Sequence, residues 1–264
     1  MTSLRHKVAL ISGTGGGQGR AAALAFAAAG ARVFGCDMKT DGAEETCELV
    51  RRAGGEMQSI HPLDLSLIEN AFKWVQEAVA LWGGIDILYN NAGKLHGRVP
   101  FGEMTINDWE LAIRYELTIA FACSRAAWPH FIERGGGVII NTASVSGHVE
   151  TSPLHAPVHG TTKAGIMGFT RMLAAEGAPF KIRAVSISPG LIRSPSTQRF
   201  WTSDDPHHRA VGRALGNKIP MGRPGECDEI AKVATFLASS EASYVNATDI
   251  CVDGGWTGVS YTQP

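Results

Sequence analysis

An apolar segment that leads into a glycine-rich turn and then a helix most constrains the fold. Residues 8–12 are apolar, residues 13–19 contain five glycines, and Arg20 opens an alanine-rich stretch. Glycine lets the backbone turn tightly, approach a pyrophosphate closely and pack the helix against the strand. The free N–H groups and positive dipole of the helix N-terminus would then face the phosphates. Residues 13–19 therefore predict a dinucleotide-binding turn.

The next apolar segment ends in Asp37, close to the roughly 20-residue spacing expected for an acidic residue that binds the ribose. A carboxylate at this position can accept hydrogen bonds from both ribose hydroxyls of NAD, and its charge repels the extra phosphate of NADP. We therefore expect NAD as the cofactor. Lys39 and Arg20 leave NADP as an alternative, and Asp37 could also be a turn former at a strand end.

Short apolar, β-branched segments alternate with longer helical patterns along the whole chain. The expected strands are residues 8–12, 31–37, 57–65, 85–89, 137–143, 182–188 and 248–252. The expected helices are residues 21–29, 41–53, 67–82, 107–133, 159–176 and 228–239. This alternation predicts an α/β fold, a Rossmann-type doubly wound parallel β-sheet with helices on both faces.

Length and composition suit one soluble domain over residues 1–264, with 44% hydrophobic residues. A formal net charge of -1 gives no reason to expect nucleic acid or an anionic membrane as partner. The five scattered cysteines form no C-x-x-C pair, which predicts reduced thiols in the cytoplasm. Residues 8–11 are too short for a signal-peptide core, and charges interrupt the longer apolar stretches, so we expect no membrane span.

Residues 191–225 form the one long irregular stretch, rich in Pro, Gly and charged residues. Long loops in compact domains are usually functional or disordered. Because this stretch follows the carboxyl end of an expected strand, it predicts a lid over a substrate cleft. Its residues Phe200, Trp201, Ile219 and Met221 would contact an apolar part of the substrate or pack within the lid.

Further motifs follow the glycine turn in order: Asp64-Leu65, residues 90–93 (N-N-A-G), Pro189-Gly190 and residues 253–255 (D-G-G). With these motifs the chain resembles the classical short-chain dehydrogenases/reductases over nearly its whole length. The resemblance implies a nicotinamide cofactor, a small-molecule substrate and a homotetramer or homodimer. The cofactor-binding residues predicted from the turn, Asp37 and the resemblance are Gly13, Gly15, Gly17, Gln18, Gly19, Asp37, Met38, Asp64, Leu65, Asn91, Ala92, Gly93, Lys163, Pro189, Gly190, Ile192 and Ser194.

The family's chemistry is carried by Asn, Ser, Tyr and Lys, where tyrosine transfers the proton and serine binds the substrate oxygen. The corresponding catalytic residues here are Glu116, Ser144, His159 and Lys163. Serine and lysine are retained. His159 replaces the tyrosine of Y-x-x-x-K, and Glu116 replaces the asparagine, so two of the four positions differ from the family.

The two changes are physically compatible with each other. His159 and Lys163 are one helical turn apart and face the same way. Imidazole, with an ordinary pKa of about 6.5, titrates near neutrality without help, but an unshielded lysine would disfavour its protonated form. We expect Glu116 to pair with Lys163 and cancel that effect. Arg114, Arg125 or water are the alternative partners of Glu116.

Histidine is shorter than tyrosine, so a water or a shifted substrate would have to fill the gap. Further histidines, His96, His207 and His208, fall in regions that would ring the cleft. We expect no metal site. A set made of His148, Glu150, His155 and His159 is conceivable, but loop histidines more often face solvent or substrate.

The motifs predict an NAD(H)-dependent oxidoreductase that interconverts an alcohol and a carbonyl or imine on a small organic substrate, with His159 as the acid-base. One alternative is a non-redox lyase, epimerase or dehalogenase on the same fold, with His159 as general base. The other is an NAD-binding protein with impaired catalysis, against which the retained Ser144 and Lys163 argue. Net formation or consumption of NADH distinguishes the first function from the others.

Overall fold

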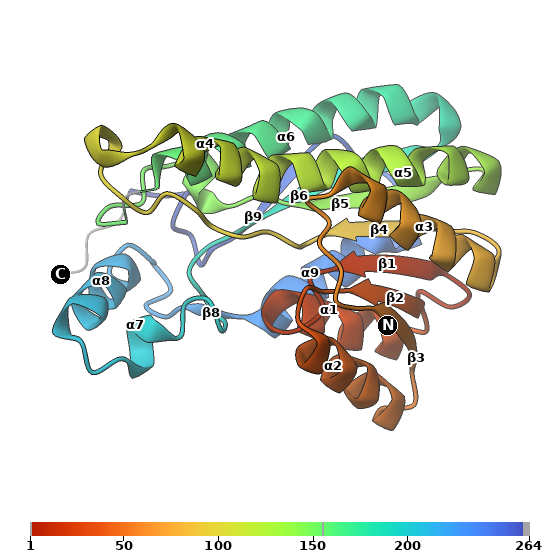
Figure 1. Ribbon diagram of the computed structural model, residues 1–264, viewed down its shortest axis with the longest axis horizontal. Coiled ribbons are helices and arrows are strands. Elements are labelled where there is room, and N and C mark those ends of the chain that lie inside the picture. The colour runs from red at the N-terminus through yellow and green to blue at the C-terminus, as the bar shows by residue number, and fades with distance from the viewer. Residues whose placement is uncertain (1, 155, 261–264) are drawn as a thin grey trace.

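Seven parallel strands form the central sheet in the order β3-β2-β1-β4-β5-β6-β9 (Figure 1). The computed structural model describes residues 2–154 and 156–260. The strands are β1 (Val8–Ser12), β2 (Arg32–Cys36), β3 (Glu56–Ile60), β4 (Ile87–Asn90), β5 (Gly137–Thr142), β6 (Ile182–Pro189) and β9 (Asp249–Val252). Strand order reverses between β1 and β4, which opens a crevice at their carboxyl ends. The predicted doubly wound parallel sheet is confirmed.

Each expected strand is present, with boundaries that differ by a few residues. All five residues of β1 are buried, because helices cover both faces of a parallel sheet. The largest difference is β3, which was expected to run to residue 65 but ends at Ile60. Pro62 follows and has no N–H to donate to the β-ladder, so strand pairing stops there.

Helices pack in two layers. α1 (Gly17–Ala28), α2 (Thr40–Arg52) and α9 (Cys227–Ala238) lie on one face, and α3 (Ile68–Trp82), α5 (Ile119–Arg134) and α6 (Pro157–Gly177) lie on the other (Figure 1). One core cluster includes Phe26 and Ile230, and the other includes Trp74 and Phe131. Trp74 is fully buried and donates its indole N–H to the Gly35 carbonyl at 3.1 Å, which fixes α3 on the sheet.

The helix expected over residues 107–133 is interrupted by a wider turn. It comprises α4 (Ile106–Ala112), a π-helical segment (Ile113–Thr118) and α5. Thr105 and Asp108 form a capping box at its start. A π-helical turn is wider than an α-helical one and often occurs at functional sites. Here it contains Glu116, which is only 4% exposed.

The segment expected to be irregular, residues 191–225, instead has helix or strand over about half of its length. It contains α7 (Arg199–Thr202) and α8 (Pro206–Gly216), and β7 (Ile192–Arg193) pairs with β8 (Gly225–Glu226). The expectation of irregular structure was wrong because the start signals of α8 were overlooked. The Asp205 side chain accepts a hydrogen bond from the His207 N–H at 2.8 Å, and proline occupies the first helical position.

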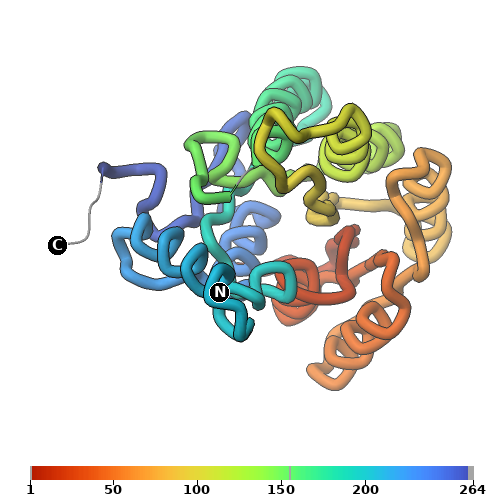
Figure 2. The backbone as a smooth tube through the Cα atoms, turned by 60° about the vertical axis from the view of Figure 1, so that its left-hand side comes forward, coloured from red at the N-terminus to blue at the C-terminus, as the bar shows by residue number. Residues whose placement is uncertain are grey.

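Helices α7 and α8 share a small core with the loops beside them, and Figure 2 shows the cyan segments packed together on one side of the molecule. The buried members are Leu191, Phe200, Val211, Leu215 and Ile219. Short 3₁₀ turns complete the chain at Phe101–Glu103, Val145–Gly147, Ala178–Phe180 and Ser240–Ala242. Within the described residues, no helix has the length and apolar character needed to cross a membrane.

We predict that backbone amides of residues 191–225 exchange hydrogen faster than those of β1, β4 and β5 in the free protein. The separate small core should open locally at a lower free-energy cost than global unfolding. Addition of NAD⁺ and a ligand should slow this exchange. Hydrogen-exchange mass spectrometry measures both effects, and exchange as slow as that of the central strands without ligand would contradict the prediction.

Candidate functional site

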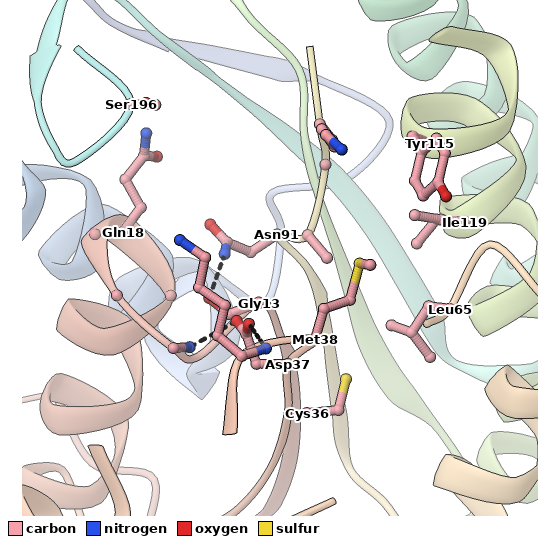
Figure 3. A pocket seen from close by; sticks show the side chains of 18 of the residues that line it. Gly13, Gln18, Cys36, Asp37, Met38, Leu65, Asn91, Tyr115, Ile119 and Ser196 are labelled. Carbon is pink, nitrogen blue, oxygen red and sulfur yellow. Dashed lines mark hydrogen bonds between the residues drawn. The ribbon is translucent and has the colours of Figure 1, made fainter. Parts of the chain in front are cut away.

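A cavity of about 560 Å³ opens at the carboxyl ends of β1, β2 and β4 (Figure 3). Most residues assigned to the cofactor from the sequence line it. They are Gly13, Gly15, Gly17, Gln18, Gly19, Asp37, Met38, Asp64, Leu65, Asn91, Ala92, Gly93 and Ser194. Segments that are far apart in the sequence therefore meet around one space of suitable size for a nucleotide.

The cavity is also lined by residues that the sequence motifs did not identify. Most are neighbours of a predicted residue, and Tyr115 and Ile119 come from the π-helical segment and α5. The full set is Gly16, Cys36, Lys39, Leu63, Lys94, Tyr115, Ile119, Pro195 and Ser196. Adjacency to Asp37, Asp64 and Gly93 could have suggested several of them, whereas no motif marked Tyr115 or Ile119.

The glycine turn and the start of α1 have the geometry of an anion-binding cradle. Gly13 has a φ of 75°, and a Cβ added at Gly19 would lie 2.0 Å from the Gly13 carbonyl oxygen. At the N-terminus of α1, Gly16 provides no side-chain cap and the first turn holds no acidic residue. The first N–H groups of the helix are therefore left for an external anion such as a pyrophosphate.

Asp37 is held against this turn by two backbone hydrogen bonds. Its Oδ2 accepts from the Gly15 N–H at 2.7 Å, and its Oδ1 accepts from the Lys39 N–H at 2.8 Å. Arg20 links the turn to α2: its guanidinium donates to the Gly15 carbonyl at 3.3 Å and pairs with Glu45 at 2.5 Å. A carboxylate with a set orientation thus lies on the cavity wall, while the nearest arginine is already neutralised.

The segment after β4 is fastened to the end of β1. Ser12 Oγ accepts hydrogen bonds from the N–H groups of Asn91 and Ala92, each at 3.0 Å. The Asn91 side chain donates in turn to the Ser12 carbonyl at 3.0 Å. Asp64 accepts from the Ser66 N–H at 2.9 Å and lies 3.4 Å from the Tyr115 hydroxyl, which joins two other parts of the wall.

Four residues assigned to the cofactor do not line this cavity: Lys163, Pro189, Gly190 and Ile192. Pro189 ends β6 and Ile192 is only 4% exposed. A Cβ added at Gly190 would lie 2.7 Å from the Asp253 Cα, so glycine is needed there for chain packing. Residues 191–225 contact the turn through Pro195, whose Cδ would lie 3.4 Å from a Cβ on Gly17.

Lys163 is buried next to the cavity wall. It is 7% exposed, and its Nζ donates to the Thr142 carbonyl at 2.8 Å. A Cβ added at Gly93, which lines the cavity, would lie 4.0 Å from this Nζ. Ser144 follows two residues after Thr142, and its Oγ accepts from the Ser146 N–H at 3.2 Å. Ser144 and the ammonium group of Lys163, which extends from α6, therefore both lie at the carboxyl end of β5.

Glu116 binds His159, and the expected direct pair with Lys163 was wrong. Its Oε1 lies 2.7 Å from His159 Nδ1, and its Oε2 accepts from the Thr162 hydroxyl. The carboxylate meets the first turn of α6, whereas the Lys163 ammonium is occupied by a carbonyl of β5. The arginines considered as partners are not used either. Arg114, for example, donates to Ser66 Oγ at 3.2 Å.

The charges of Glu116, His159 and Lys163 still influence one another. Burial raises the pKa of the Glu116 carboxyl, but hydrogen bonds from His159 and Thr162 and the charge of Lys163 outweigh burial and leave that pKa below its usual value. Burial lowers the pKa of Lys163, and the charge of Glu116 opposes this change. Glu116 is therefore an anion at neutral pH in a nearly closed environment.

The Glu116 contact also determines which nitrogen of His159 is available. An ionised carboxylate only accepts hydrogen bonds, so Nδ1 carries a proton toward Glu116. Among the described residues, Nε2 has no hydrogen-bond partner, and the side chain is 18% exposed. The imidazole can thus exchange a proton through Nε2 while Glu116 keeps the ring in one orientation.

The other histidines are engaged separately. His96 stacks on Tyr115 with ring centres 5.2 Å apart, and His207 and His208 lie in α8. The conceivable metal set is not brought together. His148 contacts Asp249 at 2.8 Å, Glu150 lies 3.8 Å from Lys218, and His159 contacts Glu116. His155 lies outside the described residues.

Comparisons with known proteins agree with this geometry. A family model described as Enoyl-(Acyl carrier protein) reductase matches residues 13–257. The 2-dehydro-3-deoxy-D-gluconate 5-dehydrogenase of Escherichia coli is 35% identical over 255 residues, 96% of each chain. A putative short-chain dehydrogenase/reductase from Burkholderia xenovorans superposes with a TM-score of 0.92 at 32% identity, covering 98% of this chain and 99% of that one.

A putative NAD(P) dependent gluconate 5-dehydrogenase from Beutenbergia cavernae, solved with bound NADP at low occupancy, is also similar. Its TM-score is 0.88 at 29% identity, and the alignment covers 98% of this chain and 99% of that chain.

We predict that Glu116→Gln lowers the free energy of unfolding at pH 7 by about 1–3 kcal/mol, since it removes a charged, buried hydrogen-bond acceptor. Because folding lowers the pKa of Glu116, its contribution is complete above the usual glutamate pKa and is lost as pH falls through the folded value. The difference between variant and parent should therefore shrink in acid. Denaturant unfolding across pH measures this, with exposed Glu110→Gln as control.

Proposed function

Because the chain belongs to the short-chain dehydrogenase/reductase family, we propose that it is an NAD(H)-dependent oxidoreductase that interconverts an alcohol and a carbonyl or imine on a small organic substrate. Two observations carry the proposal: a nucleotide-sized cavity at the carboxyl ends of the strands, and the contact of buried Glu116 with His159, although neither of these two residues lines the cavity. Tyr115 and Ile119, which line the cavity, flank Glu116 in the same continuous helix.

The residues present fit a nicotinamide dinucleotide. The uncapped start of α1 would hold the pyrophosphate, and the carboxylate of Asp37 would accept hydrogen bonds from the adenosine ribose. A bound nicotinamide would accept or donate the hydride that changes the oxidation state of the substrate. NAD rather than NADP is supported by the charge of Asp37 and by the pairing of Arg20 with Glu45. Lys39 on the cavity wall is the feature that favours NADP.

His159 would transfer the proton of the reaction. When an alcohol is oxidised, Nε2 accepts the hydroxyl proton, and the anionic Glu116 stabilises the resulting imidazolium through Nδ1. In the reverse direction the imidazolium returns that proton to the carbonyl oxygen. Ser144 would donate a hydrogen bond to the same oxygen, the role that serine has in the family. Lys163, held by the Thr142 carbonyl, would position the nicotinamide ribose and add positive charge nearby.

We expect the protein to act in the cytoplasm, as a homotetramer or homodimer. The five cysteines are free thiols. Exposed apolar side chains on the outer helices are consistent with association, since Phe121 on α5 and Met172 on α6 are both about half exposed.

We predict that the protein binds NAD(H) at least about tenfold more tightly than NADP(H), because a carboxylate beside a phosphate is worth more than about 1.4 kcal/mol of repulsion. Asp37→Ser should reduce this ratio. Exposed Asp41→Ser, at the start of α2, removes the same charge without touching the cavity wall and should leave the ratio unchanged. Fluorescence titration measures the affinities, and equal affinities in the parent would refute NAD preference.

We predict that His159→Ala lowers kcat at least about 100-fold, the usual contribution of a general acid-base, while NAD⁺ affinity stays nearly intact. Glu116→Gln should also lower kcat, since the variant no longer has the anion that stabilises the imidazolium formed when His159 accepts the proton. Steady-state NADH formation with a panel of alcohols measures both.

His130→Ala is the matched control, because His130 also pairs with a glutamate, Glu133 at 3.3 Å, but lies at the far end of α5. It should keep full turnover. His159→Tyr tests specialisation: higher activity than the parent would show that histidine is merely tolerated. Full activity of His159→Ala would remove His159 from the mechanism. No net NADH turnover with any substrate would favour a non-redox reaction or a binding protein.

A further inference from the structure

A polar face covers the sheet where β6 meets the edge strand β9. In this parallel pair Ser186 is the register partner of Asp249, and Ser188 is the partner of Cys251. Residues two apart on a strand point to the same face, so these four side chains lie together. The alternate residues Ile187 and Ile250 contribute to the apolar core instead. The polar atoms of these four side chains are therefore concentrated on one face of the β6–β9 pair.

His148, from the loop after the short turn Val145–Gly147, reaches over this face. Its Nε2 lies 2.8 Å from Asp249 Oδ2 and 3.6 Å from Cys251 Sγ, and Sγ lies 3.8 Å from that same Oδ2. All three donor atoms thus lie within 4.8 Å of one another. The imidazole is about one-third exposed and Cys251 is exposed, so an ion could reach them from solvent.

The arrangement does not suit a nucleophilic cysteine. A Cys–His–Asp relay uses both ring nitrogens, one for the thiol and one for the carboxylate. Here the thiol and the carboxylate converge on the same nitrogen, Nε2. Burial raises the pKa of the Cys251 thiol, and the charges of Asp249 and Asp253 raise it further, so the thiol is not activated.

Convergence on one nitrogen is what a shared cation requires. With zinc–ligand lengths of about 2.0–2.3 Å, a tetrahedral site places its donor atoms about 3.3–3.6 Å apart. The two distances to Cys251 Sγ, 3.6 and 3.8 Å, are close to this spacing. The 2.8 Å contact of His148 with Asp249 is a hydrogen bond and would have to lengthen by about 0.5 Å as the ion enters.

The surroundings also resemble those of a metal site. Ser186 Oγ donates to the other carboxylate oxygen, Asp249 Oδ1, at 2.5 Å, which orients Oδ2 toward the imidazole. We propose that His148, Asp249 and Cys251 bind one zinc ion per chain, with water in the fourth position. Binding would release the thiol proton to solvent and would require the imidazole to carry its proton on Nδ1 instead of Nε2, leaving a neutral site from one imidazole, one carboxylate, one thiolate and a divalent cation.

The zinc ion would have a structural role distinct from the candidate active site, because none of its three ligands lines the nucleotide cavity. It would connect the loop after β5, which begins near Ser144, to the edge strand β9. The link would oppose local opening of that loop and of the sheet edge.

Cobalt(II) titration of the full-length protein, dialysed first against a chelator, tests the proposal. One Co²⁺ per chain should produce a near-ultraviolet thiolate-to-cobalt charge-transfer band, which Zn²⁺ displaces. Cys251→Ser should abolish the band and lower Zn²⁺ affinity at least about tenfold. His148→Ala should lower Zn²⁺ affinity by a similar factor. The matched control is Cys227→Ser. It removes a thiol that contacts the Arg193 carbonyl at 3.2 Å in the parent, and it should leave the band unchanged.

Thermal unfolding provides a second readout. Zn²⁺ should raise the midpoint of the parent and of Cys227→Ser by several degrees, and leave that of Cys251→Ser unchanged. Absence of a charge-transfer band in the parent, or a band of equal size in Cys251→Ser, would overturn the proposal. All three substitutions affect side chains that are at least partly exposed, and circular dichroism checks that each variant is folded.

Discussion

The close approach of backbone segments at the glycine turn is the constraint on which the rest of the site depends. Added Cβ atoms would lie 2.0 Å from the Gly13 oxygen at Gly19 and 2.3 Å from the Gly15 oxygen at Gly42. Only glycine lets α1 and α2 pack this tightly against the ends of β1 and β2. Because of this close packing, the uncapped N-terminus of α1 faces the cavity, and Asp37 can accept a hydrogen bond from the Gly15 N–H.

The second constraint is a buried charge. Glu116 is 4% exposed, and an unpaired carboxylate in such surroundings would cost several kcal/mol. Contacts with His159 and Thr162 satisfy it and join the π-helical segment to the first two turns of α6. The same contacts orient the imidazole, so the arrangement that offsets the cost of burial also prepares His159 for proton transfer in the proposed mechanism.

The two sites use the sheet in different ways. The nucleotide cavity lies where strand order reverses, at the carboxyl ends of β1 and β4, as doubly wound sheets generally arrange it. The proposed zinc site uses the face of the edge pair β6 and β9, where Cys251 is exposed while Ser186 and Ser188 beside it are buried. One sheet can therefore hold a cofactor at its end and an ion on its edge without shared residues.

The sequence by itself determined the alternation of strands and helices, the glycine turn and the places of Asp37, Lys163 and His159, because these follow from local periodicity and short motifs. Local signals were also present for α8, in Asp205 and Pro206, although they were missed. Only the tertiary structure decided the partner of Glu116, since a π-helical turn sets the direction of that side chain. It also decided that His148 meets Asp249, 101 residues away, because packing between distant elements leaves no mark on local spacing.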